Sequence, residues 1–363
     1  MIRILIYIVM SLSFLGCAIK KHGTMSNSEI YMVVGTYTNS GSHGIYVCRF
    51  DTINGNITVD NVVKQDNPSF LCHSANKKFI YSICEEDNFN AGITAYSFSD
   101  GKLDKLNEVS GLGSSPCYIS TNGSEVAVAE YGGGSFSRFG LNQDGTLGFE
   151  LEHRFYRGNG ADPKSQASSH LHSTQYSPDN YLYITDLGCD NMYILKDGVE
   201  VSTINFEPNF GPRHFTFSKD RNYMYVIGEL SGKLCVAKRD SSTYKPIQYI
   251  LSYRSPDVNG KGSADIHMSP DGKFIYTSNR LKDDGIAIFK IMTDGKVANV
   301  GYMSTGMHPR NFAISEDGRW VIVACKNSNT IEVYSRNAES GMLIPHKERT
   351  INSIKEPVCI MLL

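Results

Sequence analysis

Residues 212–229 read PRHFTFSKDRNYMYVIGE, and the pattern returns as ADIHMSPDGKFIYTSNR at 264–280 and as PRNFAISEDGRWVIVACK at 309–326. Each copy has a short apolar run, a turn with Asp, Asn or Gly, and a second apolar run. Apolar runs rich in β-branched and aromatic residues on both sides of such a turn are typical of a β-hairpin. Related copies begin at residues 68 and 170, and a shortened copy begins at 116. A repeated hairpin is therefore the strongest signal in this sequence.

A third apolar run follows each hairpin. The seven runs are GIYVCRFD (44–51), GITAYSFS (92–99), GSFSRFGL (134–141), NMYILKDG (191–198), KLCVAKRD (233–240), GIAIFKIM (285–292) and TIEVYSRN (330–337). A four-stranded unit of about 45 residues that is repeated seven times predicts an all-β fold, the seven-bladed β-propeller.

The two ends of the chain complete this pattern. Residues 357–363 (PVCIMLL) resemble a first strand with nothing after it, and residues 31–38 (YMVVGTYT) resemble a second strand with nothing before it. Pairing these strands would build the seventh blade from both termini, close the ring and remove an exposed sheet edge. We expect residues 30–363 to form this single propeller domain.

The segment before the propeller has the features of an export signal. Residues 1–16 (MIRILIYIVMSLSFLG) place one cation, Arg3, before a short apolar run, which is typical of a signal peptide rather than of a membrane span. Leu15-Gly16-Cys17 resembles a bacterial lipobox, so we expect a lipid on Cys17 and a tether over residues 17–29. An ordinary secreted or uncleaved leader is the alternative. We therefore expect a cell-envelope protein that touches the membrane only through its lipid. Both the periplasmic face and the cell surface are compatible with this anchor.

The composition narrows the range of partners and cofactors. Lys and Arg total 35 and Asp and Glu total 37, so the chain lacks the basic excess that a nucleic-acid partner would require. His170 and His172 alternate along a predicted strand, so their side chains should point to opposite faces and would share one metal ion only if the strand were bulged. The sequence has neither a CxxC motif nor a dense carboxylate cluster, so we predict no metal and no cofactor. Five cysteines lie inside apolar runs and are interpreted as buried thiols, namely Cys72, Cys117, Cys235, Cys325 and Cys359.

The geometry of the hairpins locates a candidate site. In each hairpin the start of the first strand lies beside the end of the second strand. If the first strands are innermost, these positions meet at one end of the central channel. They are occupied by His172 with Asp186, Arg213 with Glu229, Asp265 with Arg280, and Arg310 with Lys326, and the other blades offer Tyr37, Glu85 or Glu86, and Glu130. Cations, carboxylates and imidazoles that converge in this way predict a binding site for a small polar anion.

Part of this set has a structural alternative. Propellers commonly tie neighbouring blades together through buried Asp, His and Arg side chains. Asp265 with His267 would make such a tie, and Arg310 would make another between two blades.

The same stretches resemble a known family. GTYT at 35, HxH at 170, DLG at 186, GPRH at 211, GEL at 228, SADIHMSPDGKFIYTSNR at 263 and HPRNFAISEDG at 308 are similar to motifs of the lactonase family of seven-bladed propellers. That family includes 6-phosphogluconolactonases and is related to the fungal carboxy-muconate lactonizing enzymes. The resemblance covers the chain from about residue 31 to its end. It implies a central His, a Glu and two Arg, which match His172 (with His170 as the alternate), Glu229, Arg213 and Arg280.

Resemblance and hairpin geometry together predict hydrolysis of a sugar-acid lactone by an activated water. Glu229 or neutral His172 would be the general base, and Arg213 and Arg280 would bind the substrate anion and the developing oxyanion. The other predicted substrate-binding residues are Arg310, His170, Asp186 and Lys326. Since 6-phosphogluconolactone is a cytosolic sugar phosphate and this chain carries an export signal, another sugar-acid lactone or organic acid is the alternative substrate. Two other functions stay open: a muconate-type cycloisomerase, and a non-enzymatic envelope propeller that binds a sugar acid or a protein.

Overall fold

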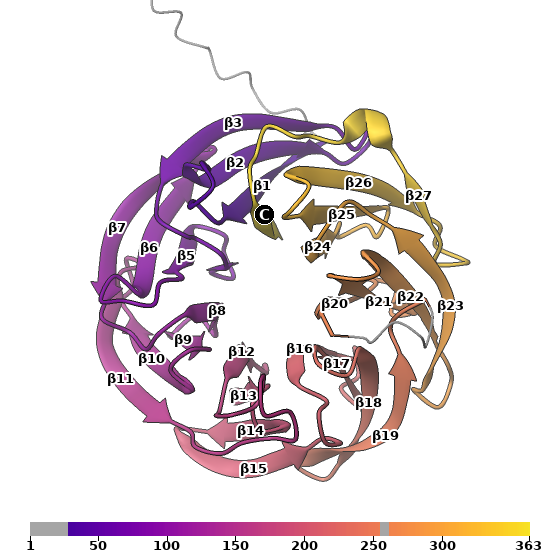
Figure 1. Cartoon of the computed structure of the whole chain (residues 1–363). Coiled ribbons are helices and arrows are strands. Elements are labelled where there is room, and N and C mark those ends of the chain that lie inside the picture. Colours follow the sequence, from indigo (N-terminus) through magenta and orange to yellow (C-terminus); the bar gives the residue numbers. More distant parts are fainter. Residues whose placement is uncertain (1–27, 255–260) are drawn as a thin grey trace, which may run out of the picture.

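The computed structural model describes residues 28–254 and 261–363, and it shows seven four-stranded antiparallel sheets arranged in a ring (Figure 1). The seven-bladed β-propeller predicted from the repeat is therefore confirmed. We number the blades 1 to 7 in chain order, with the blade that contains both termini as blade 7.

In every blade the first strand lies nearest the centre of the ring (Figure 1). The first strands of blades 1 to 7 are β4 (Leu71–His73), β8 (Pro116–Thr121), β12 (Leu171–Tyr176), β16 (Pro212–Phe217), β20 (Ser263–Met268), β24 (Pro309–Ile314) and β28 (Pro357–Leu362). The second strands are β5 (Phe79–Cys84), β9 (Glu125–Glu130), β13 (Tyr181–Asp186), β17 (Tyr223–Gly228), β21 (Phe274–Asn279), β25 (Trp320–Cys325) and β1 (Glu29–Thr36).

The third and fourth strands form the outer half of each blade. The third strands are β6 (Gly92–Ser99), β10 (Ser135–Leu141), β14 (Asn191–Lys196), β18 (Lys233–Asp240), β22 (Gly285–Ile291), β26 (Thr330–Arg336) and β2 (Gly44–Asp51). The outermost strands are β7 (Lys102–Ser110), β11 (Leu147–Phe155), β15 (Val199–Asn205), β19 (Thr243–Leu251), β23 (Val297–Ser304), β27 (Leu343–Pro345) and β3 (Ile57–Lys64).

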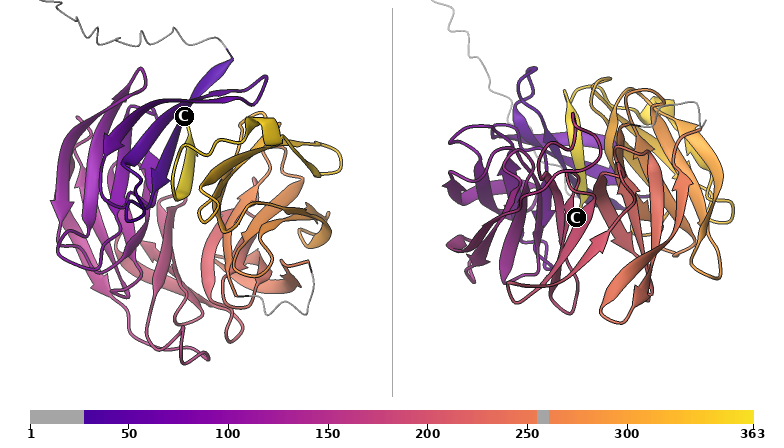
Figure 2. Two further views of the ribbon diagram at one scale, coloured as in Figure 1. Left: turned by 45° about the horizontal axis from the view of Figure 1, so that its top comes forward. Right: turned by 60° about the horizontal axis from the view of Figure 1, so that its bottom comes forward.

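The ring is closed by the two ends of the chain. β28 pairs antiparallel with β1, and the yellow C-terminal strand lies beside the indigo strands in Figures 1 and 2. The closure predicted from the terminal segments is therefore confirmed. One boundary differs, because Glu29 already pairs with Asp51 in β1 and does not belong to a tether. The expected signal segment over residues 1–16 and the expected lipid site at Cys17 lie outside the described residues.

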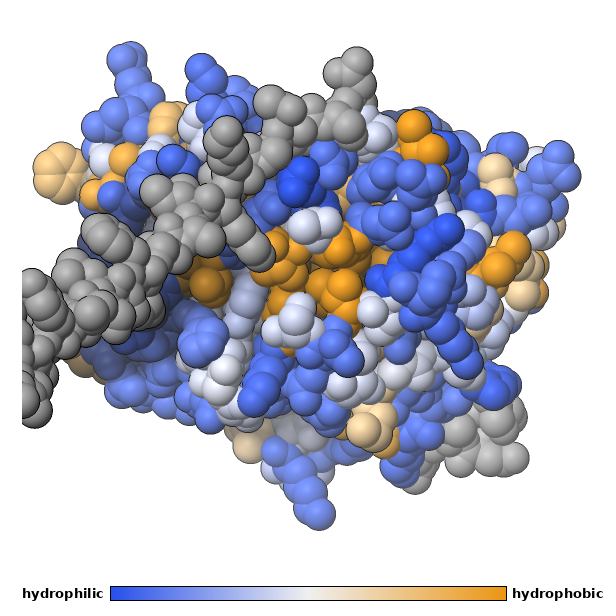
Figure 3. All heavy atoms as spheres, turned by 90° about the horizontal axis from the view of Figure 1, so that it is seen from above, coloured by the Kyte–Doolittle hydropathy of each residue, from blue (hydrophilic) through white to orange (hydrophobic). Residues whose placement is uncertain are grey.

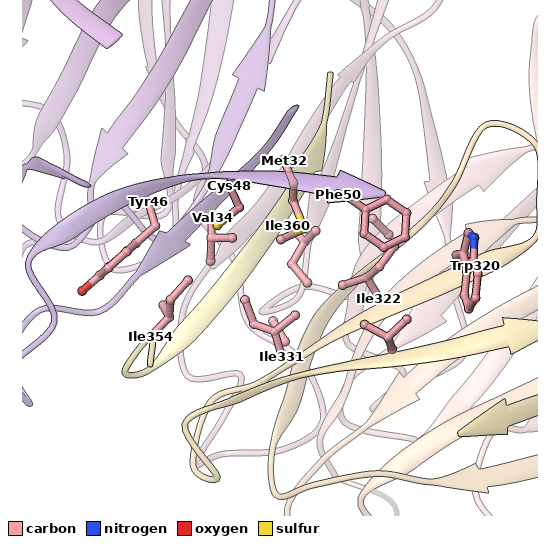
Figure 4. Close-up of a cluster of buried hydrophobic side chains, with 13 residues drawn as sticks. Met32, Val34, Tyr46, Cys48, Phe50, Trp320, Ile322, Ile331, Ile354 and Ile360 are labelled. Carbon is pink, nitrogen blue, oxygen red and sulfur yellow. The ribbon is translucent and has the colours of Figure 1, made fainter. Parts of the chain in front are cut away.

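A hydrophobic cluster joins blade 7 to blade 6 and so connects the start of the chain to its end (Figure 4). Met32, Phe50 and Ile360 of blade 7 pack against Trp320 and Ile322 of blade 6. The edge of the Trp320 ring meets Phe50 with ring centroids 6.3 Å apart, a favourable aromatic geometry. Ring closure thus buries apolar surface in addition to pairing two strands.

The face of the molecule drawn in Figure 3 is mainly hydrophilic, with local apolar areas. Figure 3 shows one such area at the centre of the face where blades 6 and 7 meet. On the outermost strand β11, Phe149 is 90% exposed and Phe155 is 60% exposed. Within the described ranges the only helix is the short 3-10 turn η1 (Lys347–Arg349), and no helix there is long and apolar enough to cross a membrane. All eight cysteines of the described residues are unpaired. Four of the five predicted buried thiols, at 117, 235, 325 and 359, are buried, whereas Cys72 is only partly buried.

A β-bulge near the start of the first strand is the local feature that positions the candidate site. Every first strand except β4 has a shift of pairing register at this point. In β12 the pairs Leu171–Asp186 and Ser173–Thr185 leave His172 unpaired between them. In β16 and β24 the same shift leaves out Arg213 and Arg310. Because a bulge redirects the side chain of its extra residue, it turns this position away from the regular alternation of the strand.

Candidate functional site

The site residues come together at the end of the ring where the first strands begin and the second strands end, which we call the top face. His172, Arg213 and Arg310 stand at the bulges of β12, β16 and β24. Glu229 and Arg280 directly follow β17 and β21. Five side chains from four neighbouring blades therefore reach the same place because the same structural position recurs in each blade.

Glu229 is the centre of this group. Its Oε2 accepts a hydrogen bond from Nε of Arg213 at 2.8 Å and forms an ion pair with Nη2 of Arg280 at 3.2 Å. Nε2 of His172 lies 3.9 Å from the same oxygen, which is too far for a hydrogen bond. The structure thus brings together the four residues that the sequence selected as the central set.

The other donors of the two arginines are held by the propeller. Nη1 of Arg213 donates to the backbone oxygen of Ala264 and to Nε2 of His214, the latter at 3.2 Å. Nε of Arg280 donates to the backbone oxygen of Gly262 at 2.9 Å. Among the described residues none accepts a hydrogen bond from Nη2 of Arg213. That nitrogen is available to a negatively charged oxygen of a bound molecule.

The two oxygens of Glu229 have different surroundings. Oε2 contacts both arginines, whereas Oε1 has no partner among the described residues, and the side chain is 24% exposed. Burial raises the pKa of the Glu229 carboxyl, but the charges of Arg280, Arg213 and Arg310 lower it more, so its pKa lies below the ordinary value. Glu229 is therefore an ionised carboxylate with one oxygen open to water.

His172 is deeper than Glu229 and is uncharged. Its side chain is only 7% exposed. Burial lowers the pKa of His172 far below its ordinary value, and the nearby charges of Arg213 and Arg310 lower it further. Its Nδ1 faces the thiol of Cys117 at 3.8 Å. A neutral imidazole at this position can accept a proton, but its access to solvent is smaller than that of Glu229.

Arg310 and Lys326 both lie over the ring of Tyr37. The guanidinium carbon of Arg310 is 5.4 Å from the ring centroid, and Nζ of Lys326 is 4.9 Å from it. The Tyr37 hydroxyl in turn donates to Glu85. Lys326 also pairs with Glu356 at 3.7 Å, but Arg310 has no hydrogen-bond or ion-pair partner among the described residues. An aromatic ring can orient a guanidinium without using its donors, so Arg310 keeps its donors for an anion.

Two predicted substrate-binding residues have other contacts. The buried carboxylate of Asp186 accepts hydrogen bonds from the backbone amides of His170, Gly188 and Cys189 and from the side chains of Ser169 and Tyr193. These five donors all come from blade 3 and the segments next to it, and a role of Asp186 in substrate binding stays a prediction. His170 stacks on Tyr131 and contacts its backbone oxygen, 2.9 Å from Nδ1. Tyr131 therefore lies between His170 and His172, and His170 has no contact with Glu229.

Tyr131 is a side chain of the site that the sequence did not select, and Glu130 was placed there instead. His214 and His308 fall near the selected hairpin positions in the sequence. Tyr131 lies between the two histidines, with its ring edge to His172 at 5.5 Å between centroids. Its neighbour Glu130 was the predicted residue. Glu130 is buried inside blade 2, where it accepts hydrogen bonds from Ser135 and Ser137 and pairs with His153. His308, which precedes β24, faces Nη1 of Arg280 at 3.4 Å, and His214 contacts Arg213. Glu229 and Arg280 directly follow their second strands, and the same offset after β9 would have been the signal for Tyr131.

Asp265 does not meet Arg280, its predicted hairpin partner. It instead accepts hydrogen bonds from His267 of its own blade, from His214 of blade 4 and from Asn311 of blade 6. Asp265 of blade 5 thus connects its blade to blades 4 and 6, as expected for a tie between blades. In the described part of the chain, no group of three or more His, Cys, Asp or Glu side chains is arranged to hold a metal ion.

Known proteins resemble this chain over nearly its whole length. The family described as lactonase, 7-bladed beta-propeller, matches residues 31–362. A 6-phosphogluconolactonase of Formosa agariphila is 34% identical over 335 residues, which cover 86% of this chain and 94% of that protein. A 6-phosphogluconolactonase of Bacillus subtilis is 32% identical, covering 91% of this chain and 97% of that protein. The structure of a Pseudomonas aeruginosa periplasmic gluconolactonase has a TM-score of 0.86 at 28% identity, covering 93% of this chain and 99% of that one.

Proposed function

This chain belongs to the lactonase family of seven-bladed β-propellers, and from that premise we propose that it hydrolyses the ring ester of a sugar-acid lactone. The observation that carries the proposal is the asymmetry of Glu229. One carboxylate oxygen contacts two arginines, and the other is open to water. A protein that only bound an anion would require the cations but no base with access to water.

The proposed reaction needs no covalent intermediate. Oε1 of Glu229 takes a proton from a water whose oxygen attacks the lactone carbonyl carbon. The carbonyl oxygen becomes an oxyanion, which Nη2 of Arg213 and the free donors of Arg280 stabilise. The bond from the carbonyl carbon to the ring oxygen then breaks, and Glu229 returns the proton to that ring oxygen. The product is the open-chain hydroxy acid.

The low pKa of Glu229 is compatible with this role. The positive charges of Arg280, Arg213 and Arg310 weaken the carboxylate as a base. When an oxyanion forms beside Arg213 and Arg280, the negative charge offsets part of their positive charge, so Glu229 holds a proton more strongly at the moment when it has accepted one. Neutral His172 is the second candidate for the base, but its smaller exposure favours Glu229.

We propose that Arg310 and Lys326 bind the acidic substituent of the substrate. Arg310 supports this because it is a partly buried guanidinium whose donors have no partner among the described residues. Two of the relatives are named for a phosphorylated lactone and one structure for an unphosphorylated one. We further propose that the lipid anchor expected at Cys17 keeps the activity in the cell envelope.

The test is hydrolysis of gluconolactone and 6-phosphogluconolactone by the purified protein, followed as acid release above the spontaneous rate. Replacing Glu229→Gln keeps the size but removes the base, so kcat should fall at least about 100-fold with little change in KM. Glu207→Gln is the matched control, because Glu207 is 31% exposed and paired with Lys233 on the same blade without contacting the site.

The outcomes separate the candidate functions. Turnover that is lost in Glu229→Gln and kept in Glu207→Gln supports the proposal. Near-normal turnover in Glu229→Gln would move the role of base to His172. Absence of turnover on every lactone, together with binding of gluconate, would favour the non-enzymatic binder.

A further inference from the structure

A chain of hydrogen bonds reaches Glu229 from the neighbouring blade. Oδ1 of Asp265 lies 2.8 Å from Nδ1 of His214, Nη1 of Arg213 lies 3.2 Å from Nε2 of His214, and Nε of Arg213 lies 2.8 Å from Glu229. Asp265 comes from β20, whereas His214 and Arg213 are consecutive residues of β16. Three of the four side chains are almost completely buried, and Glu229 alone has substantial contact with solvent.

The chemistry of these groups fixes where each proton lies. Burial raises the pKa of Asp265, but its two histidine partners lower it more, so it is an ionised acceptor. His214 must therefore donate from Nδ1. Burial lowers the pKa of His214 to about 4, and the charge of Arg213 contributes to this shift, so the ring is neutral and Nε2 presents a lone pair. Arg213 donates to that lone pair.

We propose that His214 and Asp265 are positioning residues for Arg213, an assignment that rests on the proposed function. The carboxylate selects the tautomer of the imidazole, and the imidazole holds one side of the guanidinium. With Nε on Glu229 and Nη1 on His214 and the Ala264 backbone, the plane of Arg213 is fixed and Nη2 is left for the oxyanion.

The two oxygens of Asp265 serve different partners, and this provides a control. Oδ1 binds His214, which leads to the site. Oδ2 accepts from Nε2 of His267 at 2.9 Å and from Nδ2 of Asn311 at 2.6 Å, and these contacts tie blades 5 and 6. His267 packs its ring edge against Phe312 and contacts neither Arg213 nor Glu229. A purely structural role of Asp265 would make both oxygens equally important for activity.

The experiment compares three variants in turnover and in thermal unfolding. His214→Phe keeps the aromatic packing of the ring on Tyr118 and His172 but removes both hydrogen bonds. His214→Gln retains an oxygen to accept from Arg213 and an amide to donate to Asp265. His267→Phe removes a partner from the other oxygen of Asp265.

We expect kcat to fall about 10- to 100-fold in His214→Phe with KM changing much less, as for a displaced catalytic group. His214→Gln should recover most of the turnover, and His267→Phe should stay near wild type even though its Tm falls. Equal loss of turnover in His214→Phe and His267→Phe, or no rescue by His214→Gln, would overturn the assignment.

A measurement that needs no activity keeps this inference separate from the proposed function. In 15N NMR spectra of histidine-labelled protein at pH 7, His214 should show a protonated Nδ1 and an unprotonated Nε2. A protonated Nε2 would overturn the inference whether or not any lactone is hydrolysed. If no lactone is hydrolysed and the expected tautomer is found, gluconate binding by calorimetry replaces turnover. It should weaken in His214→Phe and not in His267→Phe, and equal effects would again overturn the assignment.

Discussion

Individual charges at the top face are controlled by their neighbours. Burial and nearby arginines keep His172, His214 and His308 neutral, and the same arginines keep Glu229 ionised. The pKa of His308 falls to about 2, with burial as the largest cause and Arg280 the next. Three uncharged imidazoles therefore lie among three arginines, and Glu229 pairs with two of these arginines, Arg213 and Arg280. The arginine donors that remain free attract a substrate anion.

These neutral histidines should make folding stability depend on pH. The unfolded chain binds a proton on each histidine below its ordinary pKa of about 6.5, whereas folded His214 does so only near pH 4. The stabilising contribution is therefore fully present above pH 6.5 and is lost as the pH falls toward 4. For His214 alone it amounts to about 3 kcal/mol.

Urea unfolding at pH 7.5, 6 and 5 would measure this dependence. The free energy of unfolding should fall toward pH 5, and the slope should be smaller in His214→Gln, which lacks one of the titrating groups. His267 acts in the opposite direction, because its pKa is raised and its contribution is lost as the pH rises. Stability that increases from pH 7.5 to pH 5 would contradict the prediction.

Neighbouring elements are joined by a contact that recurs around the ring. In five blades the glycine that turns from the third to the fourth strand lies against an aromatic ring near the start of the second strand of the preceding blade. These contacts are Gly55–Trp320, Gly101–Tyr31, Gly145–Phe79, Gly295–Tyr223 and Gly341–Phe274. A side chain at such a glycine would enter the space of the ring, so the contact sets how closely two blades approach.

Gly145→Ala should therefore destabilise the protein more than a comparable substitution elsewhere. A Cβ at Gly145 would lie 2.2 Å from Phe79, and the residue has a φ of +86°. Gly123→Ala is the matched control, because Gly123 has a φ of +93° and nothing lies within 4 Å of the added atom. We expect a loss of about 1–2 kcal/mol in the control from the backbone alone, and a further 1–3 kcal/mol in Gly145→Ala from overpacking. Equal losses of unfolding free energy in the two variants, measured by denaturant unfolding, would show that Phe79 moves aside without destabilising the protein.

The whole molecule depends on a ring that the two termini close. β28 is the innermost strand of blade 7, and Val33 and Val34 of its partner β1 are fully buried. Ile360 of β28 also belongs to the cluster that joins blades 6 and 7. β28 therefore holds β1 in place, and blade 7 requires strands from both ends of the described part of the chain.

Deleting residues 357–363 should abolish the cooperative fold. The deletion removes the partner of β1, exposes buried valines and opens a sheet edge that invites aggregation. Size-exclusion chromatography and thermal unfolding would record the loss. Deleting Leu363 alone is the control, because this residue follows β28 and contributes one backbone hydrogen bond to Tyr31. An unchanged Tm in the longer deletion would refute closure by the terminal strands.

The sequence by itself determined the number and order of the blades and the place of the site. Both follow from local patterns, because the spacing within one hairpin places Arg213 and Glu229 on adjoining strand ends, where they pair. The same spacing put His172, Arg280 and Arg310 at the top face.

Only the tertiary structure decided which of these groups meet across blades. Arg280 joins Glu229 of the preceding blade instead of Asp265, and Asp265 reaches His214 over 51 positions of sequence. Asp186 accepts hydrogen bonds from backbone amides of its own blade, and Tyr131 occupies the position expected for Glu130. These outcomes depend on how the bulges turn each side chain and on how closely the blades pack, which local periodicity does not encode.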